Sequence, residues 1–183
     1  ALLAMSALTP IALLFSLARP TEIPTALPRV GALVMGPLYL GVPMAMLALI
    51  RTFGTRAEGA GLVVVTLMCA WLSDTAGYIV GKSVKGPKLY PAVSPGKTWS
   101  GAVGGLAGSV SGAVLAHFTF LPTLPLALGM LVAGLAGVAG QAGDLCESVL
   151  KRSAKVKDSG GILPGHGGVL DRIDALLFCA VTV

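Results

Sequence analysis

The sequence contains few charged residues, and this scarcity excludes the commonest class of protein. Charged residues make up 11% of the 183 residues and hydrophobic residues 55%, whereas about a quarter of an ordinary soluble domain is charged. So few polar groups cannot cover the apolar surface of such a chain in water. The composition therefore indicates a protein whose solvent is lipid, and it excludes an ordinary water-soluble domain.

Cysteine is also rare, and its positions exclude two further classes. The three cysteines, Cys69, Cys146 and Cys179, lie within or beside apolar runs. An odd number of cysteines without motif spacing provides neither a disulfide framework nor a zinc site. The net charge of +5 is modest, and the basic residues fall between apolar runs. That distribution is typical of the cytoplasmic side of a membrane protein, so nucleic acid is not an expected partner.

Long apolar runs divide the chain into membrane spans. A bilayer core needs about 20 apolar residues per helix. The complete runs that satisfy this requirement are residues 30–50, 60–81, 99–119 and 126–145. Residues 1–18 form a first span or part of one, and a sixth span begins near Asp174. The predicted fold is all-α, a polytopic bundle of transmembrane helices that forms a single membrane-embedded domain over residues 1–183, which we expect to be truncated at both ends.

The charges of the loops predict the orientation of the bundle. The 82–97 loop contains four lysines and no acid, and the 147–172 stretch contains five lysines and arginines. Two spans separate these loops, so both lie on one side, and the positive-inside rule makes that side cytoplasmic. The turn with Arg51 and Arg56 then lies outside, which violates the rule less than the reverse orientation would. The sequence predicts a membrane protein with a polar loop region on the cytoplasmic side.

Small residues recur at every fourth position in the run over 99–119. The two rows are Gly101, Gly105, Ser109 and Ala113, and Gly104, Gly108 and Gly112. Small residues at this spacing let the backbones of membrane helices approach closely. Two rows on one helix predict a neighbouring helix on each side.

One acidic residue lies inside a predicted span. Asp74 is one helical turn from Tyr78 and shares its helix face. A carboxylate in hydrocarbon costs at least roughly 2.5–3.5 kcal/mol, so it needs a partner or a wet cavity, and it is functional by default. The alternative is an interfacial aspartate that reaches headgroup water, since the span ends near Gly81.

The end of the fifth span presents a polar helix face. Helical spacing places Gln141, Asp144 and Ser148 on one line, and Asp144, Glu147 and Lys151 on another. This face carries acids, a hydroxyl and then a base at the predicted cytoplasmic mouth. Helix capping does not explain Asp144, because the helix dipole disfavours an acid near a C-terminal end.

A second pair of acids begins the next span. Asp171 and Asp174 are three residues apart, and capping would explain either one alone, because acids are favoured near a helix N-terminus. Together with Asp144 they supply oxygen ligands from two helix ends. Mg²⁺ suits such a set, because it needs only one or two carboxylates besides waters and substrate phosphates.

A glycine-rich segment lies between these acids. Residues 157–168 contain two glycine clusters around Pro164 and precede a helix. Glycine lets backbone amides point inward as an anion-binding nest, and the following helix N-terminus adds positive potential. Among neighbouring cations and acids, this segment indicates phosphate chemistry. His166 could contact phosphate or act as an acid, or it could be a hydrogen-bonded loop residue.

Three segments near the C-terminus resemble the signature of the phosphatidate cytidylyltransferases, also called CDP-diacylglycerol synthases. They are residues 148–152, 157–158 and 164–174, which together span 27 residues with the spacing of the family.

Two earlier segments resemble further elements of that family in the expected order. Residues 94–101 resemble Ser-Pro-x-Lys-Thr-Trp-Glu-Gly, and residues 74–78 resemble Asp-Thr-x-Ala-Tyr. Ser100 stands where the family usually has glutamate, and Gly77 where it usually has alanine. The family motifs thus fall within residues 70–174.

The resemblance implies a transferase of phospholipid biosynthesis. A phosphate oxygen of phosphatidate would attack the α-phosphorus of CTP, giving CDP-diacylglycerol and pyrophosphate. A phosphate nucleophile is already ionised at neutral pH, so catalysis depends on metal and cations that position the two anions. The implied cofactor is Mg²⁺ or Mn²⁺. The implied partners are CTP, phosphatidate in the bilayer and membrane lipids, and a homo-oligomer is left open.

The resemblance and the spacing together assign roles to residues. Asp144 and Asp171 are the principal metal ligands, with Asp74 and Asp174 as second candidates. The catalytic set is Asp144, Asp171, Lys151 and Arg172. The predicted substrate-binding residues are Ser94, Lys97, Ser148, Arg152, Lys157, His166, Gly167 and Gly168.

Two other functions are compatible with these features. A CTP-dependent lipid kinase would share the nucleotide and the membrane, but it would release CDP in place of pyrophosphate. A transporter or scaffold with an anion site would suit interrupted spans and intramembrane acids. It would not need the dense set of acids and bases over residues 144–174.

Overall fold

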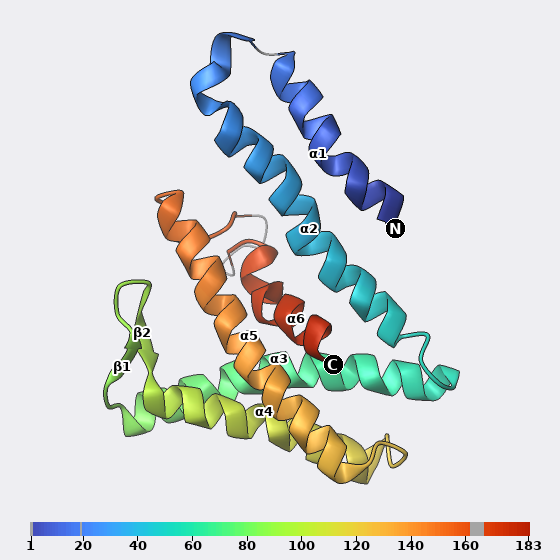
Figure 1. Ribbon diagram of the computed structural model, residues 1–183. Helices are drawn as coiled ribbons and strands as arrows, with labels where there is room; N and C mark the ends of the chain where they lie inside the picture. Colours follow the sequence, from blue (N-terminus) through green and yellow to red (C-terminus); the bar gives the residue numbers. More distant parts are fainter. Residues whose placement is uncertain (1, 19, 162–166) are drawn as a thin grey trace. The chain divides into compact units, whose positions relative to one another are not determined.

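The protein is an integral membrane protein that divides into two compact units. A computed structural model describes residues 2–18, 20–161 and 167–183 (Figure 1). The units are Ala1–Ala45 and Met46–Val183. Among the described residues, the helices long and apolar enough to cross a membrane lie in Ile23–Ile50, Arg56–Val84, Trp99–Thr119 and Leu126–Ser153. The predicted all-α, polytopic fold is confirmed.

The first unit contains two apolar helices joined by a short 3₁₀ helix. Its elements are α1 (Leu2–Leu17), η1 (Pro20–Thr25) and α2 (Ala26–Ile50), whose last residues belong to the second unit. The apolar part of α1, Ala7–Leu17, is shorter than a bilayer span.

The second unit is a helical bundle with a β-hairpin. Its elements are α3 (Arg56–Val84), β1 (Lys88–Tyr90), β2 (Ser94–Thr98), α4 (Trp99–Thr119), α5 (Leu126–Ser153) and α6 (Leu170–Thr182). The α4 helix packs along α3, and α5 packs against both α4 and α6 (Figure 1). The two strands are antiparallel, with Lys88 opposite Thr98 and Tyr90 opposite Ser94.

Side-chain caps determine where the two central helices begin. The Thr55 hydroxyl accepts a bond from the Glu58 amide at 3.2 Å, and the Thr55 amide donates to the Glu58 carboxylate at 2.8 Å. This reciprocal capping box satisfies two amides at the start of α3. The Thr98 hydroxyl likewise accepts from the Gly101 amide at 3.1 Å, so α4 begins directly where the hairpin ends.

The glycine rows of α4 contact a helix on each side, as the sequence predicts. A Cβ atom on Gly101 would lie 2.8 Å from the Gly77 carbonyl oxygen of α3, and one on Gly104 would lie 2.5 Å from Val80 Cβ. Further along the helix, the Ser109 hydroxyl donates to the Ala133 carbonyl of α5 at 2.6 Å. The small residues of α4 therefore let the backbones of α3 and α5 approach it closely.

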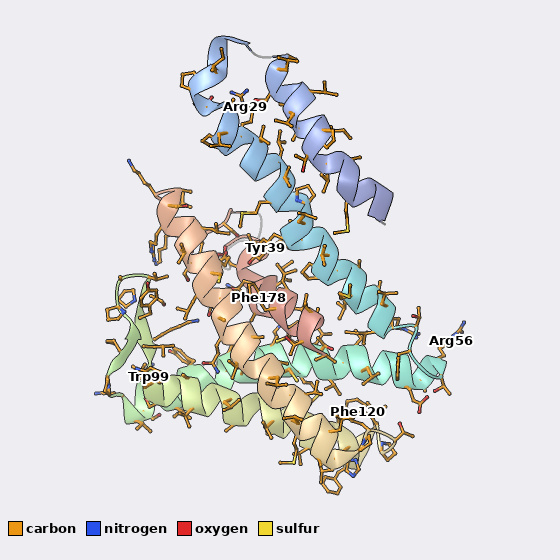
Figure 2. All side chains as sticks on the ribbon, viewed as in Figure 1. Arg29, Tyr39, Arg56, Trp99, Phe120 and Phe178 are labelled. Atoms are coloured by element: carbon orange, nitrogen blue, oxygen red, sulfur yellow. The ribbon has the colours of Figure 1, made fainter. Side chains whose placement is uncertain are left out.

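Small side chains fill the interior of the second unit, and large apolar ones point outward. Its buried core consists mainly of alanine, with two cysteines, two leucines and one valine. Leu131 and Val103 are 61% and 65% exposed, as expected where lipid is the solvent and van der Waals packing holds the helices together. Trp99 and Phe120 lie at opposite ends of α4 (Figure 2), and aromatic residues favour membrane interfaces.

The helix ends differ from the sequence-based boundaries by up to four residues at α2, α3 and α6, and the differences are larger in two places. The predicted 82–97 loop contains the β-hairpin, which pairs backbone groups that a loop would leave to water. The fifth helix continues to Ser153, eight residues beyond the predicted 145, because its last two turns are polar but still helical. In both segments, charged side chains therefore lie on a strand or a helix and not on an irregular loop.

Candidate active site

A cavity of about 880 Å³ opens in the second unit where α3, the hairpin, α4 and α5 meet. The C-terminal end of α3 and the N-terminal end of α4 form part of its wall. Gly77, Gly81 and Gly101 contribute to the lining, and their missing side chains leave room between the helices. Asp74, Ser94, Lys97 and Asp144 also line this cavity, so it unites three segments that are distant in the sequence.

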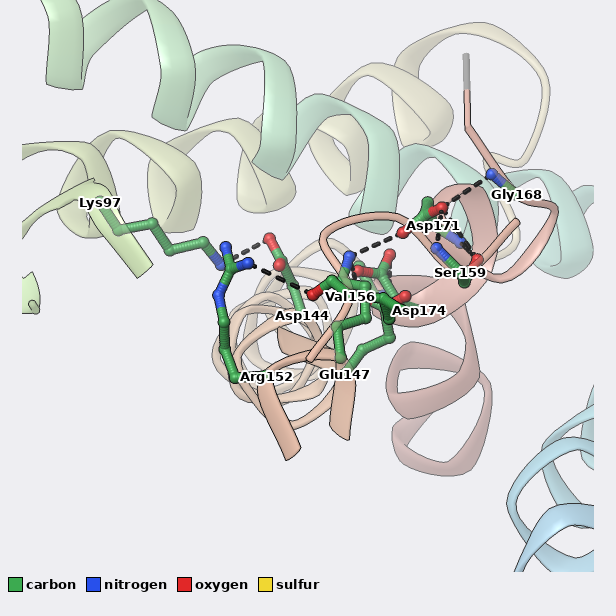
Figure 3. Close-up of polar contacts among 11 residues, drawn as sticks. Lys97, Asp144, Glu147, Arg152, Val156, Ser159, Gly168, Asp171 and Asp174 are labelled. Atoms are coloured by element: carbon green, nitrogen blue, oxygen red, sulfur yellow. Dashed lines mark hydrogen bonds and ion pairs between the residues drawn. The ribbon is translucent and has the colours of Figure 1, made fainter. Parts of the chain in front are cut away.

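An ion pair crosses the cavity from the hairpin to α5. Lys97 Nζ lies 2.5 Å from an Asp144 carboxylate oxygen, and both side chains are 27% exposed. Figure 3 shows Lys97 reaching from the end of β2 toward Asp144. The pair thereby joins the Ser-Pro-x-Lys element to Asp144 of α5.

Asp144 lies within electrostatic range of two other acids. Asp74, on α3, interacts with the charges of both Asp144 and Lys97. Asp174, on α6, is buried and interacts with the charges of Asp144, Glu147 and Asp74. Acids from three helices are therefore gathered near one end of the bundle.

A second ion-pair system joins α5 to α6. Lys151 Nζ contacts the carboxylate of Glu147 one turn earlier on α5 and lies 2.6 Å from Asp171 Oδ1. The Glu147 side chain is completely buried. A buried acid of this kind is tolerated only with a charged partner, and removal of the partner is costly. Lys151 therefore holds two acids in place.

Asp171 organises the described ends of the glycine-rich segment. Its Oδ2 atom accepts bonds from the Ser159 amide at 2.9 Å, the Ser159 hydroxyl at 2.8 Å and the Gly168 amide at 2.8 Å. Gly167 has φ +77° and a Cβ there would meet Asp171, so glycine is required for this turn. The predicted nest of amides thus binds a carboxylate of the protein itself.

These bonds also determine the charge of Asp171. Partial burial acts to raise the pKa of this carboxyl, but the bonds from Lys151, Gly168 and Ser159 outweigh it and hold the pKa well below its ordinary value. Donors to the ionised form favour that form. Asp171 is therefore a carboxylate at any neutral pH.

The carboxylates around Asp144 could bind a divalent metal that, like Mg²⁺, needs few ligands from the protein. Among the residues that the structure describes, no three His, Cys, Asp or Glu side chains form a metal-binding group. The grouped acids supply oxygen atoms alone, next to lysines that could hold phosphates. Mg²⁺ is commonly held by one or two carboxylates plus substrate phosphates, so the donor set suits this ion and does not form a closed protein cage.

The sequence comparisons identify the family of the chain. A profile of the cytidylyltransferase family matches residues 2–183. The chain belongs to this family. The resemblance predicted from residues 70–174 is thereby confirmed.

Several relatives of this family member have been named. It is 43% identical over 146 residues to a phosphatidate cytidylyltransferase of Brucella suis, covering 79% of this chain and 53% of the relative. It is 38% identical over 152 residues to one of Bacillus subtilis, covering 82% of this chain and 55% of the relative. The chain spans about half the length of the curated relatives it matches.

The structure brings predicted site residues of this family member into two groups. Ser94, Lys97, Asp74 and Asp144 share the cavity. The other group is Lys151, Asp171, Gly167 and Gly168, with the buried Ser148 and Asp174 on the adjoining helices. Asp144 and Asp171, the predicted principal metal ligands, thus have different lysine partners.

Three predicted residues lie elsewhere. Arg152 Nη1 donates to the Val156 carbonyl at 3.3 Å (Figure 3), and Lys157 and Arg172 are exposed. Within the described part of the chain, none of these three lines the cavity. His166 lies outside the described residues.

Sequence reasoning assigned no site role to five residues that the structure places here. Lys82, Lys85 and Lys88 line the cavity beside Gln141, which donates to the Ala102 carbonyl at 3.0 Å. Glu147 is the buried partner of Lys151. The signals were present, because the 82–97 loop has lysines without acids and Glu147 precedes Lys151 by one helical turn.

Proposed function

We propose that this protein is a phosphatidate cytidylyltransferase that converts CTP and phosphatidate into CDP-diacylglycerol and pyrophosphate. The observation that carries the proposal is the cavity in which Lys97 and Asp144 meet beside further acids and lysines. Membership of the cytidylyltransferase family and relatives named phosphatidate cytidylyltransferase support the same reaction.

The chemistry needs positioning more than proton transfer. The phosphate oxygen of phosphatidate is already ionised, so its attack on the α-phosphorus of CTP requires no strong base. The difficulty is bringing two polyanions together, which fixed cations and dipoles achieve by electrostatic stabilisation. Lys97 lies where it can move from Asp144 to a substrate phosphate, and the lysines around the cavity add positive charge.

Asp144 would hold Mg²⁺ or Mn²⁺ together with Asp74 or Asp174. Asp171 would contribute through its loop and Lys151, or as a ligand if its present donors release it. The bound metal would supply positive charge for the phosphates of the substrates. These assignments are supported by the electrostatic grouping of the acids.

The site would face the cytoplasm of a bacterial-type cell, where CTP is available. The lysines of the hairpin region and the basic end of α5 belong to elements that meet at the same cavity. Phosphatidate would enter laterally, because its acyl chains stay in the bilayer.

Identification of the released phosphate product tests the proposal. The complete protein, purified in detergent, is incubated with phosphatidate and CTP labelled in turn at the α- and γ-phosphorus. We expect the α-label in CDP-diacylglycerol and the γ-label in pyrophosphate. Release of CDP with γ-label on the lipid would establish a lipid kinase, and recovery of unchanged CTP would favour a scaffold or transporter.

A further inference from the structure

We propose that Lys82, Lys85 and Lys88 form a binding site for the phosphate groups of a substrate. This inference rests on the proposed function, which it deepens by assigning the part of the cavity that receives phosphate. The phosphates could belong to the triphosphate of CTP or to the headgroup of phosphatidate, which share the same chemistry.

The three lysines reach the same cavity from different structural elements. Lys82 lies on the last turn of α3, Lys85 directly follows that helix, and Lys88 begins β1. All three line the cavity that also contains Lys97 and Asp144. Lysine side chains on a flat surface can move apart to reduce their repulsion. Here the end of α3 and the start of β1 place the three lysines around one cavity.

The cavity contains more lysines than acids, since Asp74 and Asp144 line it together with these three lysines and Lys97. Asp144 pairs with Lys97. Within the described part of the chain, no carboxylate forms an ion pair with Lys82, Lys85 or Lys88. Unneutralised cations around a concave site attract anions, and lysine is a common point-charge ligand for phosphate.

The backbone at Lys85 is held in an unusual conformation. Lys85 has φ 60°, in the left-handed region that residues other than glycine adopt with difficulty. Its amide donates to the Gly81 carbonyl at 3.2 Å, and its carbonyl accepts a bond from the Ser100 hydroxyl. Ser100 also bonds to the Thr98 hydroxyl at 3.0 Å, so the start of α4 fixes this conformation.

Such a conformation is kept where the surrounding structure determines it, and functional sites are enriched in it. The Ser100 bond links the residue after α3 to the first turn of α4, and the hairpin lies between these two points in the sequence. Lys82 is fixed as well, because its Nζ lies 3.2 Å from the Tyr78 hydroxyl and 5.4 Å from the centre of that ring. The ammonium group of Lys82 and the backbone of Lys85 are therefore positioned before a ligand arrives.

The test measures substrate affinity separately from turnover. Lys82→Gln, Lys85→Gln, Lys88→Gln and the triple variant are made in the complete protein and reconstituted in phosphatidylcholine nanodiscs. Calorimetry then measures the binding of CTP and of a short-chain phosphatidate. We expect the triple variant to lose roughly tenfold or more in affinity for one of these ligands, which corresponds to about 1.4 kcal/mol.

Lys155→Gln provides the matched control. Lys155 is an exposed lysine that also has a positive φ, 57°, but it does not line the cavity. Its replacement removes the same charge and should leave both affinities within twofold of the unmodified protein. Lys85→Arg, which keeps the charge, should retain more affinity than Lys85→Gln.

The two arms identify the source of the phosphate. Weaker binding of CTP assigns the lysines to the triphosphate, and weaker binding of phosphatidate assigns them to the lipid headgroup. Affinities for both ligands within twofold of the unmodified protein would overturn the inference. Because binding is measured without turnover, a protein that fails to make CDP-diacylglycerol would refute the proposed function without deciding this test.

Discussion

At the scale of single residues, the two predicted metal ligands have different surroundings. Asp144 has one lysine partner and lies in the cavity. Asp171 has Lys151 as well as bonds from Ser159 and Gly168. A carboxylate with one partner can release it to a substrate more easily than one with several. The two acids should therefore respond differently to the same substitution.

We predict that Asp144→Asn and Asp171→Asn each reduce turnover at least about 100-fold, as expected when a group that stabilises the transition state is lost. Asparagine keeps the size of the side chain but removes its charge. Asp144→Asn should leave thermal stability nearly unchanged, whereas Asp171→Asn should also lower it, because several donors lose a charged acceptor. The measurements are CDP-diacylglycerol formation from labelled CTP and thermal unfolding in detergent.

Asp158→Asn is the control for this pair of variants. Asp158 is exposed in the same polar stretch, and its substitution should have a much milder effect on turnover. Near-normal rates for Asp144→Asn and Asp171→Asn would contradict their assignment, and Asp74 would become the next residue to replace.

We also predict that turnover requires Mg²⁺ or Mn²⁺. The acids grouped around Asp144 offer oxygen ligands, without a cysteine or histidine set among the described residues. Treatment with EDTA should abolish CDP-diacylglycerol formation, and excess Mg²⁺ should restore it. The control is EDTA already saturated with Mg²⁺. Full turnover in metal-free buffer would refute the metal assignment.

At the scale of the elements, α4 is the helix on which the packing depends. We predict that Gly101→Ala lowers the free energy of unfolding by about 1–3 kcal/mol, the usual cost of overpacking. Its new Cβ would lie 2.8 Å from the Gly77 carbonyl oxygen, a backbone atom that cannot rotate away. Thermal unfolding in detergent measures the effect.

Gly134→Ala is the matched control for Gly101→Ala. Gly134 lies in the middle of α5, and a Cβ there would come no closer than 3.8 Å to Val110. Alanine should be neutral or stabilise the protein by roughly 0.4–1 kcal/mol, because it restricts the unfolded chain. Equal stability of Gly101→Ala and the unmodified protein would show that α3 and α4 are packed less closely than the 2.8 Å approach implies.

The helices were predictable from the sequence because the length of apolar runs determines membrane spans. Predicted residues 99–119 coincide with α4, whose ends are marked by the Thr98 cap and the turn at Phe120. The hairpin was missed because its strands are short and contain proline and glycine, which normally indicate a loop. The last turns of α5 were missed because polar residues ended the apolar run.

The motif positions were predictable, but the partners of their side chains were not. The sequence placed Lys97 and Asp144 in one site without showing that they pair, since 47 residues separate them. It predicted a nest of amides for phosphate, whereas Asp171 itself accepts from Gly168 and Ser159. Pairing of this kind depends on how α5, α6 and the intervening segment pack in three dimensions.

At the scale of the whole molecule, the hairpin and the 147–172 stretch should face the same compartment. We predict that cysteines introduced singly at Lys88 and Lys155, in a protein without its own cysteines, react with an impermeant reagent from the cytoplasmic side. A cysteine at Arg56, at the other end of α3, should react from the opposite side. Labelling of Lys88 and Lys155 from opposite sides would contradict the predicted orientation.

The small-residue interior of the second unit has a consequence for how this sequence can change during evolution. In a water-soluble protein the large buried side chains resist substitution, and most surface positions vary freely. Here the least replaceable positions are the glycines, alanines and serines where helices touch. Outward leucines and valines could exchange among apolar residues with little effect, so selection at the lipid-facing surface would act mainly against charge.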